Sequence, residues 1–411
     1  MIEQREKAIS KAIQLLDDIQ NSDKGIPALK RTDPSCCWVT AETLDAILDN
    51  NRNTYAMILF AREMCEFLVT SQLSSGGWPM MVGSEIESTL ATGHAVYALS
   101  KARKAFSKDI AFVASLEDTI SKGIQWLKAT VNSDGCWGCE PHDTSGEGNK
   151  TRVISTYFAL LGFSECATEH SQLVKTAFKG LQQLKNTDGG YGPCMGGQST
   201  IYHTARVISI FYKFYPLRMR EMGDSVSFLK KRIKKFRPEQ LDSESYVPSD
   251  ASGEIRFWGN TPIALINALC DASCKYKNIE KIQDWVLKTQ KDDGSWKLGN
   301  SNDHVVETWS TVEAIGALIK INEKFTYKEN KIHRTKIKIY RTLSISLAIL
   351  LAIAFIVLGG NSSIAAVRNL ILLMPSWLKT LIVSVLLSGF GINILSSFIY
   401  DKIIKFFKKD K

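Results

Sequence analysis

The stretch Gln72-Leu-Ser-Ser-Gly-Gly-Trp78 returns near the end of the chain as Gln290-Lys-Asp-Asp-Gly-Ser-Trp296, and both have the form Q-x-x-x-G-x-W. Two partial copies between them, Asp134–Trp137 and Asp188–Tyr191, keep the glycine and the final aromatic residue. An eroded copy, Gln20–Ile26, opens the series. Neighbouring copies are roughly 50–60 residues apart, with space for one further copy before the last, and a period of this size indicates a repeat architecture.

Each copy of the motif lies between two predicted helices. Apolar residues at helical spacing precede it, as in 56–68 and 279–287, and a more apolar segment follows it, as in 92–99 and 311–318. The glycine fits a turn that needs a positive φ, and the aromatic residue packs back on the helix pair. We therefore predict six helical hairpins, of which the fifth, around 249–258, has lost most of the motif.

The repeated Q-x-x-x-G-x-W motif, followed each time by an apolar helix, resembles the repeat of squalene and terpene cyclases and of protein prenyltransferase β subunits. The resemblance extends over roughly residues 5–322. It implies an all-α fold, an α/α toroid in which six hairpins close into a ring and the second helices line a central cavity. We assign residues 1–325 to this toroid.

The net charge of +9 is concentrated at one end of the chain. Residues 331–411 contain twelve Lys and Arg against two Asp, so the preceding residues are close to neutral overall. The charge therefore gives no indication of a basic nucleic-acid surface on the helical domain, and no nucleic-acid partner is expected.

Two apolar runs in the C-terminal segment predict a membrane anchor. They cover 343–358 and 381–400, and we predict two transmembrane helices within 343–400, between a basic juxtamembrane linker at 326–342 and a basic tail at 401–411. Positive charge at both ends places both in the cytoplasm, so the toroid is expected to be cytosolic on a two-span, multi-pass membrane protein. The alternative is a pair of very apolar soluble helices. Since no apolar signal region opens the chain, the nine cysteines are interpreted as reduced thiols.

The start of each second helix, at one mouth of the expected cavity, is the first place to look for chemistry. Cyclases of the resembled superfamily that protonate an alkene carry Asp-x-Asp-Asp there. This chain has Glu85-Ile-Glu87-Ser88 at the matching place in its second unit. Glu85 and Glu87 are therefore candidate catalytic acids, and the alternative is a solvated rim.

A zinc site is a second candidate. Protein prenyltransferases hold zinc with a motif similar to Asp-x-Tyr-His-Thr, and the segment Thr200–Thr204 matches it except at its first residue. Tyr202 and His203 are therefore also catalytic candidates. One unit earlier the chain offers a C-x-x-C-x-x-H arrangement, and thiolate with imidazole suits tetrahedral zinc. The candidate ligands are Cys136, Cys139, His142 and His203, and the alternative is that Cys136 is the small residue of a turn and its neighbours are loop residues.

Four residues are candidates for substrate binding. Arg152 and Arg206 are each followed by Val-Ile-Ser and are predicted at equivalent positions, where they either clamp a diphosphate or join hairpins by salt bridges. His304 and Trp309 belong to the start of the last second helix, and His94 either lies in the core or faces the cavity. Aromatic residues near second helices belong either to the core or to a lining that stabilises carbocations: Trp38, Tyr97, Tyr157, Phe158, Tyr202, Trp258 and Trp309.

These patterns leave two functions open. The first is a membrane-anchored enzyme, similar to a terpene cyclase or prenyltransferase, that acts on a polyprenyl or other lipidic substrate in the cavity. The second is a non-catalytic toroid that binds a lipid, a peptide or a partner protein and acts through its membrane tail as a regulatory or defence effector. A prenyltransferase β subunit that needs a separate α subunit ranks last, because a tail anchor is not expected there.

Overall fold

The computed structural model describes residues 2–325 except 29–32, 51–53, 144–145, 147, 167–170, 234–241, 247–254, 276 and 297–307. The chain divides into two compact units, Met1–Thr326 and Tyr327–Lys411, and the first contains every described residue. Within the described part, no helix has both the length and the hydropathy needed to cross a membrane. The predicted membrane hairpin at 343–400 lies outside the described residues.

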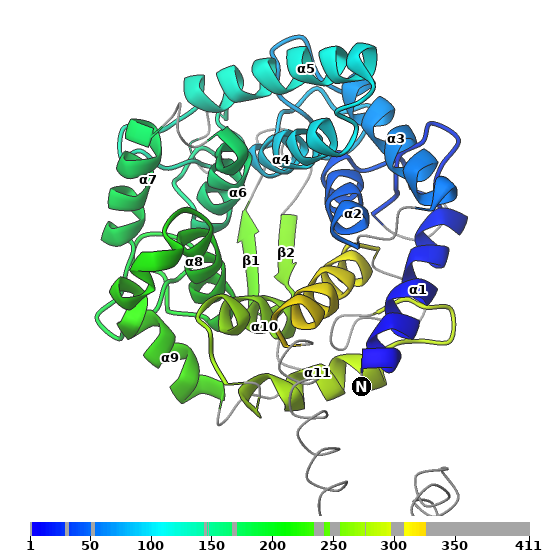
Figure 1. Ribbon diagram of the computed structural model, residues 1–411. Helices are drawn as coiled ribbons and strands as arrows, with labels where there is room; N and C mark the ends of the chain where they lie inside the picture. The colour runs from blue at the N-terminus through cyan, green and yellow to red at the C-terminus, as the bar shows by residue number, and fades with distance from the viewer. Residues whose placement is uncertain are drawn as a thin grey trace, which may run out of the picture. The chain divides into compact units, whose positions relative to one another are not determined.

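Twelve helices of the described part alternate between an outer and an inner layer (Figure 1). The outer helices are α1 (Ile2–Asp18), α3 (Tyr55–Thr70), α5 (Ile110–Ala129), α7 (Ser171–Gln183), α9 (Gly223–Ile233) and α11 (Lys277–Thr289). The inner helices are α2 (Cys37–Asp49), α4 (Thr89–Ala105), α6 (Val153–Phe163), α8 (Ile201–Phe214), α10 (Thr261–Asp271) and the helix over 308–325. Two short 3₁₀ helices, η1 (Ser164–Cys166) and η2 (Pro216–Met222), follow α6 and α8. The predicted α/α toroid of six hairpins is confirmed.

Contacts between the two ends of the domain close the ring. Arg5 on α1 is fully buried; its Nη1 donates to Gln283 Oε1 on α11 at 2.9 Å, and its Nε donates to Asn322 Oδ1 at 2.5 Å. The backbone of the last inner helix joins the first unit as well, because Thr308 N donates to Ala28 O at 3.0 Å. Figure 1 shows α1 beside α11 at this junction.

The Q-x-x-x-G-x-W motif holds each hairpin to the next one. Gln72 Nε2 donates to Gly76 O within its own turn and to Thr119 O on the following outer helix, both at 2.9 Å. The last copy repeats this across the ring closure, where Gln290 Nε2 donates to Ala8 O at 2.8 Å. The glycine adopts the predicted positive φ, which is 96° at Gly76. The glycines of three other copies, Gly135, Gly189 and Gly294, also have a positive φ.

A buried threonine fixes the last residue of the turn, an aromatic residue or Ile26, to the inner helix that follows in five units. Trp78 N donates to Thr92 Oγ1 at 2.9 Å, and Trp78 Nε1 donates to Leu68 O at 2.7 Å on the preceding outer helix. Five units share the bond from the turn backbone to a threonine hydroxyl. We call these residues the anchor threonines: Thr40, Thr92, Thr156, Thr204 and Thr311.

The fifth unit differs from the other five. A two-stranded antiparallel sheet, β1 (Asp242–Tyr246) with β2 (Ile255–Gly259), stands where its turn is expected, and Asp242 pairs with Gly259. The sheet is the one departure from the predicted all-α class in the described residues. Since β2 ends just before α10 begins, the sheet belongs to the end of the ring where inner helices start.

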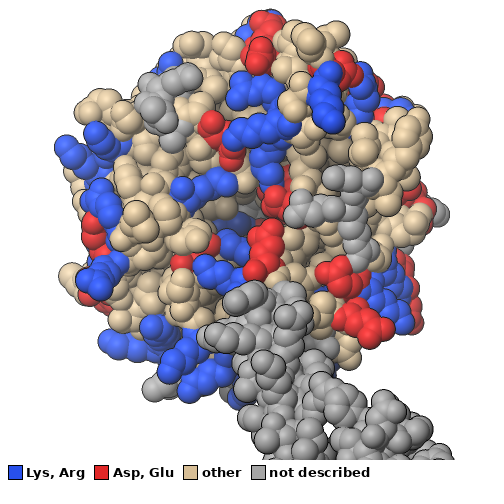
Figure 2. Space-filling view, viewed as in Figure 1, with Lys and Arg blue, Asp and Glu red and all other residues tan. Residues whose placement is uncertain are grey.

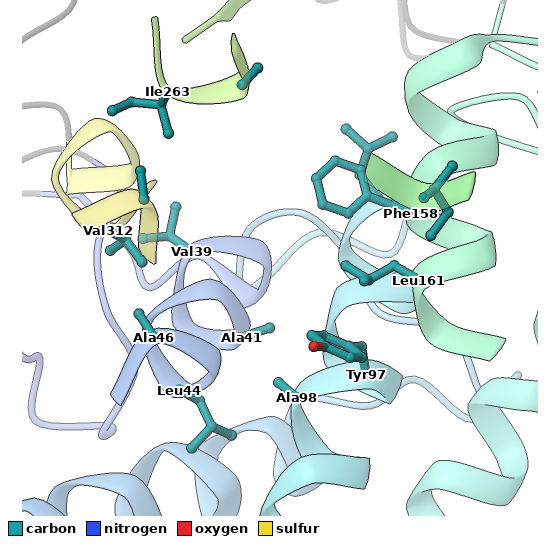
Figure 3. Close-up of a cluster of buried hydrophobic side chains, with 14 of the residues drawn as sticks. Val39, Ala41, Leu44, Ala46, Tyr97, Ala98, Phe158, Leu161, Ile263 and Val312 are labelled. Atoms are coloured by element: carbon teal, nitrogen blue, oxygen red, sulfur yellow. The ribbon is translucent and has the colours of Figure 1, made fainter. Parts of the chain in front are cut away.

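The inner helices bury apolar residues against one another. Figure 3 shows Val39 and Leu44 of α2 and Val312 of the last inner helix among these side chains. The inner helices are apolar on the faces that meet, as the chain pattern predicts. Their remaining face carries the polar residues described next.

Candidate functional site

A cavity of about 520 Å³ lies within the ring of inner helices. This volume is in the range of pockets that enclose small molecules. Its lining comes from inner helices α2, α4, α6, α8, α10 and 308–325, with Pro216 added by η2. Figure 2 shows a hollow at the centre of one face of the ring, with Lys, Arg, Asp and Glu around it.

The lining residues form three tiers that follow the anchor threonines. The inner tier lies two residues after each anchor and contains Glu42, His94, Phe158, Arg206 and Glu313. The middle tier lies five residues after each anchor and contains Asp45, Tyr97, Leu161, Ser209 and Gly316. The outer tier lies nine residues after four of the anchors and contains Asp49, Lys101, Lys213 and Lys320. These spacings place the residues of one helix on one face.

The inner tier holds two buried carboxyl groups beside one arginine. The Arg206 guanidinium pairs with Glu313 from the last inner helix, and Glu42 of α2 faces both. Burial raises the pKa of Glu42 well above its ordinary value, and the Glu313 carboxylate raises it further against the opposing effect of Arg206. Burial and the Glu313 carboxylate thus favour the protonated, neutral form of Glu42.

The middle tier places an ionised carboxylate one helical turn from Glu42. Lys101 on α4 donates to Asp45 and to Asp49, both on α2. Although burial alone would raise the pKa of Asp45, Lys101 and His94 hold it well below its ordinary value. The two neighbouring carboxyl groups, Glu42 and Asp45, are thus driven toward opposite protonation states.

The other cations of the cavity also have partners within it. Lys320 Nζ lies 2.7 Å from Asp271 Oδ2. Lys213 Nζ donates to Tyr97 Oη at 2.6 Å, and its nearest carboxylate oxygen, on Glu165, is 3.9 Å away. The cavity is therefore lined by ion pairs as well as by aromatic rings. The ion pairs were not predicted from the sequence, in which the inner helices are mainly apolar.

The predicted acid pair lies outside this cavity. Glu85 is exposed in the loop before α4, and Glu87 is half-buried there with His142 Nε2 3.4 Å from its Oε2. Neither belongs to the lining residues, because the loop is at the end of the ring where inner helices begin, whereas the cavity tiers lie along the following helical turns.

The structure does not bring the four predicted zinc ligands together. Cys136 contacts Ala177 O at 3.7 Å, as the residue of a turn, while Cys139 Sγ lies 3.1 Å from Ser155 Oγ. Burial raises the pKa of the Cys136 thiol to about 12, which disfavours the thiolate that zinc needs. No group of three or more His, Cys, Asp or Glu among the described residues is arranged to hold a metal ion. These residues do not fit zinc.

His203 and Tyr202 sit at the first turn of α8. The buried His203 ring bonds through Nδ1 to Thr200 Oγ1 at 2.8 Å, the residue that caps the helix. Tyr202 lies under Arg206, whose Cζ is 5.0 Å from the ring centroid. Trp309 stacks near Trp38 at 6.2 Å between ring centroids, at the same level.

The predicted equivalence of the two arginines is wrong. Arg152 precedes its anchor, Thr156, and forms the N-cap of α6, whereas Arg206 follows its anchor, Thr204, and lines the cavity. The two arginines therefore do not lie side by side in the cavity, as a diphosphate clamp would require. His304 lies outside the described residues.

His94 occupies the inner tier and lines the cavity, where the sequence left its position open. Its Nε2 is 3.9 Å from Asp45 Oδ2, and burial lowers its pKa. Three further residues of the site were missed from sequence: Glu42, Asp45 and Glu313. The signal that finds them is the anchor threonine, since each lies at a fixed distance after one.

The comparisons with known proteins agree with this geometry. A model of the prenyltransferase alpha-alpha toroid domain matches residues 5–200, 95–231 and 221–343. The chain therefore belongs to this family. No curated protein matches it.

Several solved structures are similar to the chain in fold. The type II terpene cyclase MstE from Scytonema is 11% identical with a TM-score of 0.55, covering 78% of this chain and 99% of the cyclase. A variant of MstE in complex with geranylgeranyl dihydroxybenzoate has a TM-score of 0.56. An inactive variant of an alpha-1,6-mannanase of Salegentibacter sp., in complex with alpha-1,6-mannotriose, is 10% identical with a TM-score of 0.57 and covers 76% of this chain and 98% of the mannanase. At such identities the likeness shows the toroid fold alone.

Proposed function

We propose that the toroid is an enzyme that performs acid–base chemistry at an oxygen atom of a lipidic substrate. The observation that carries the proposal is the contrast between Glu42 and Asp45, whose pKa values are shifted in opposite directions by burial and by Lys101. Two titratable neighbours with separated pKa values are the usual mark of an acid and a base in one site. Glu42 is the proton donor, and Asp45 is the ionised carboxylate that stabilises developing positive charge.

The chemistry of Glu42 favours an oxygen over an alkene as the proton acceptor. A raised pKa favours the protonated form of Glu42, but it also makes Glu42 a weaker acid. Such an acid suits a hydroxyl, epoxide or leaving-group oxygen, which is far more basic than a C=C bond. The Arg206–Glu313 pair holds the donor's surroundings fixed.

Turnover measurements on matched variants test this proposal. Full-length protein in detergent is offered squalene epoxide, farnesyl and geranylgeranyl diphosphates and a prenylated dihydroxybenzoate, each of which carries an oxygen that can accept a proton, and products are identified by mass spectrometry. Glu42→Gln should lower turnover by roughly 10²–10⁴-fold, because the amide cannot donate an acidic proton. The control Glu85→Gln, outside the cavity, should retain it. No turnover of any substrate, or full activity in Glu42→Gln, would overturn the proposal.

A non-catalytic ligand-binding toroid is the second candidate. It is favoured by the pairing of cavity cations with protein carboxylates, as in Lys101 with Asp45 and Lys320 with Asp271, and by the absence from the sequence of Asp-x-Asp-Asp. Its partner is then a lipid, a peptide or another protein. Loss of a cellular phenotype on deletion of 343–400, with no effect of Glu42→Gln, supports this function over the enzyme.

We further propose that residues 343–400 tether the toroid to a membrane with both termini in the cytoplasm. The two apolar runs and the basic segments that flank them support this tether. Full-length protein should remain in the membrane fraction after carbonate extraction. Release of the full-length chain by carbonate would overturn the tether.

A further inference from the structure

We infer that the cavity binds a neutral, hydroxyl-rich group, carried either by a free sugar or polyol or by the headgroup of a glycolipid. The inference names the substrate class for the proposed function and rests on it only in taking the cavity as the ligand site. Three properties of the lining carry it: its charge balance, the occupation of its aromatic faces, and its unsatisfied polar atoms.

The charge balance of the lining disfavours an anionic ligand. Six carboxyl residues line the cavity against four cations, and three of those cations are already paired with carboxylates inside it. An anionic headgroup would have to break these buried pairs or enter a field of carboxylates. The six carboxyl residues are Glu42, Asp45, Asp49, Asp271, Glu313 and Glu323, and the cations are Lys101, Arg206, Lys213 and Lys320.

Three tyrosine rings at the site are occupied by the protein's own cations. Lys213 Nζ is 4.2 Å and Lys101 Nζ is 5.4 Å from the ring centroid of Tyr97. Arg206 Cζ lies 5.1 Å from the Tyr157 centroid and 5.0 Å from that of Tyr202. A carbocation or an organic ammonium ion would compete with these fixed charges for the same ring faces. The lining is thus poorly suited to a hydrocarbon that reacts through cations.

Lining residues carry polar atoms that a hydroxyl group can satisfy. Glu42 and Arg206 are more than nine-tenths buried, yet Glu42 Oε2 and Arg206 Nε have no hydrogen-bond partner in the described part of the chain. Two further lining atoms, Ser209 Oγ and Asn267 Oδ1, also have no hydrogen-bond partner among the described residues. A hydroxyl donates and accepts at once, so adjacent hydroxyls serve both kinds of atom, whereas a hydrocarbon serves none.

Ligands that share a tail and differ in the headgroup test the inference. Full-length protein in a sugar-free amphipathic polymer is titrated calorimetrically with octyl glucoside, octanol, octyl phosphate and octylamine. Octyl glucoside should bind at least tenfold tighter than the other three, because each well-placed hydrogen bond contributes about tenfold in affinity. Equal or tighter binding of octanol indicates a hydrocarbon site, and preference for the phosphate or the amine indicates an ionic one. Each of these results would overturn the inference.

Methyl glucoside separates the two sources of the hydroxyl-rich group. Binding comparable to that of octyl glucoside indicates a free sugar or polyol, and much weaker binding indicates a glycolipid headgroup. The variant Asn267→Leu should weaken octyl glucoside roughly tenfold without changing octanol, while Met195→Leu, on an exposed loop residue outside the lining, should change neither.

The outcome is distinguishable from that of the proposed function, because binding and turnover are read separately. Loss of turnover in Glu42→Gln together with no preference for octyl glucoside contradicts the hydroxyl-rich ligand and leaves the acid–base proposal standing. Preference for octyl glucoside together with full turnover in Glu42→Gln supports the hydroxyl-rich ligand and contradicts the acid–base proposal.

Discussion

At the scale of single residues, the site depends on Glu42, a buried glutamate whose pKa is raised although Arg206 is close to it. Burial and the nearby carboxyl groups of Glu313 and Asp45 raise the pKa of Glu42, whereas Lys101 and His94 hold the pKa of Asp45 low. Both are on α2, one turn apart, and a single helix therefore supplies the donor and the carboxylate. The arrangement costs stability, as functional sites often do.

That cost gives a prediction for Glu42→Gln. Because the native state holds the Glu42 proton more tightly than the unfolded chain, the native state binds more protons above about pH 4.3, the unfolded value. The free energy of unfolding should therefore fall as pH rises from there through the raised native pKa. Thermal melts across this range should show a flatter pH dependence for Glu42→Gln than for the wild type. Parallel curves would contradict the shift, and Leu161→Met controls for a change of the lining.

At the scale of elements, three hairpins are built around two bonds of a turn tryptophan: Trp78, Trp137 and Trp296. In the second unit, Thr92 accepts from Trp78 N, and the indole donates to Leu68 O. The first bond joins the turn to the inner helix, and the second joins it to the outer helix. The turn therefore sets the phase of the inner helix, and with it which residues reach the cavity.

Replacing one anchor threonine tests this role. Thr92→Val keeps the shape but leaves Trp78 N–H buried without its acceptor, which should cost about 1–3 kcal/mol of stability. Thr92→Ser retains the hydroxyl and should lose less. Urea unfolding of the two variants measures the difference, and an equal loss in both would show that the hydroxyl contributes nothing.

Two glycines separate backbone strain from close approach. Gly76 has φ 96°, and a Cβ there would meet Lys122 O at 2.7 Å; Gly83 has φ 88° with nothing within 4 Å. Gly83→Ala should cost about 1–2 kcal/mol, the penalty of the left-handed conformation alone. Gly76→Ala should cost clearly more, because the α5 backbone must also move. Chemical denaturation checks both, and equal losses would contradict the packing of the turn on α5.

The repeat motif allowed the hairpins to be predicted because its glycine and tryptophan act locally. The glycine adopts the positive φ of the turn, and the tryptophan bonds to the helix just before it. The candidate acid residues, by contrast, were sought at the mouth of the cavity and not along its wall, and this too has a physical reason. The motifs of related enzymes pointed to residues such as Glu85 before the inner helices, while the phase of those helices depends on the buried threonines. The pair of Arg206 with Glu313 joins residues 107 positions apart, so it depends on ring closure, which a local pattern does not specify.

At the scale of the whole molecule, the domain is a closed ring whose first and last helices complete each other. Arg5 contributes to this closure through α11 and the last inner helix, and Gln290 does so through α1. A closed ring holds opposite walls of the cavity in register. The paired charges of Arg206 and Glu313, from non-adjacent inner helices, require that register.

Breaking the contacts that close the ring should therefore destabilise the helices on both sides of the junction, α1 and α11. Arg5→Met removes two buried hydrogen bonds from a charged donor and should destabilise the domain by about 2–5 kcal/mol. Hydrogen exchange should increase in α1 and α11 before it increases in α5. Lys11→Met, at an exposed contact with Lys291 O, is the matched control. Uniform exchange changes around the ring would contradict a local closure.

The protonation state of Glu42 tests the account most directly, because no substrate is needed. Infrared difference spectra between wild type and Glu42→Gln, recorded over a pH series, isolate the Glu42 carboxyl stretch. We expect a protonated carboxylic acid that titrates well above the ordinary glutamate value of 4.5. A carboxylate at every pH above that value would contradict the proton donor, and with it the function proposed for the cavity.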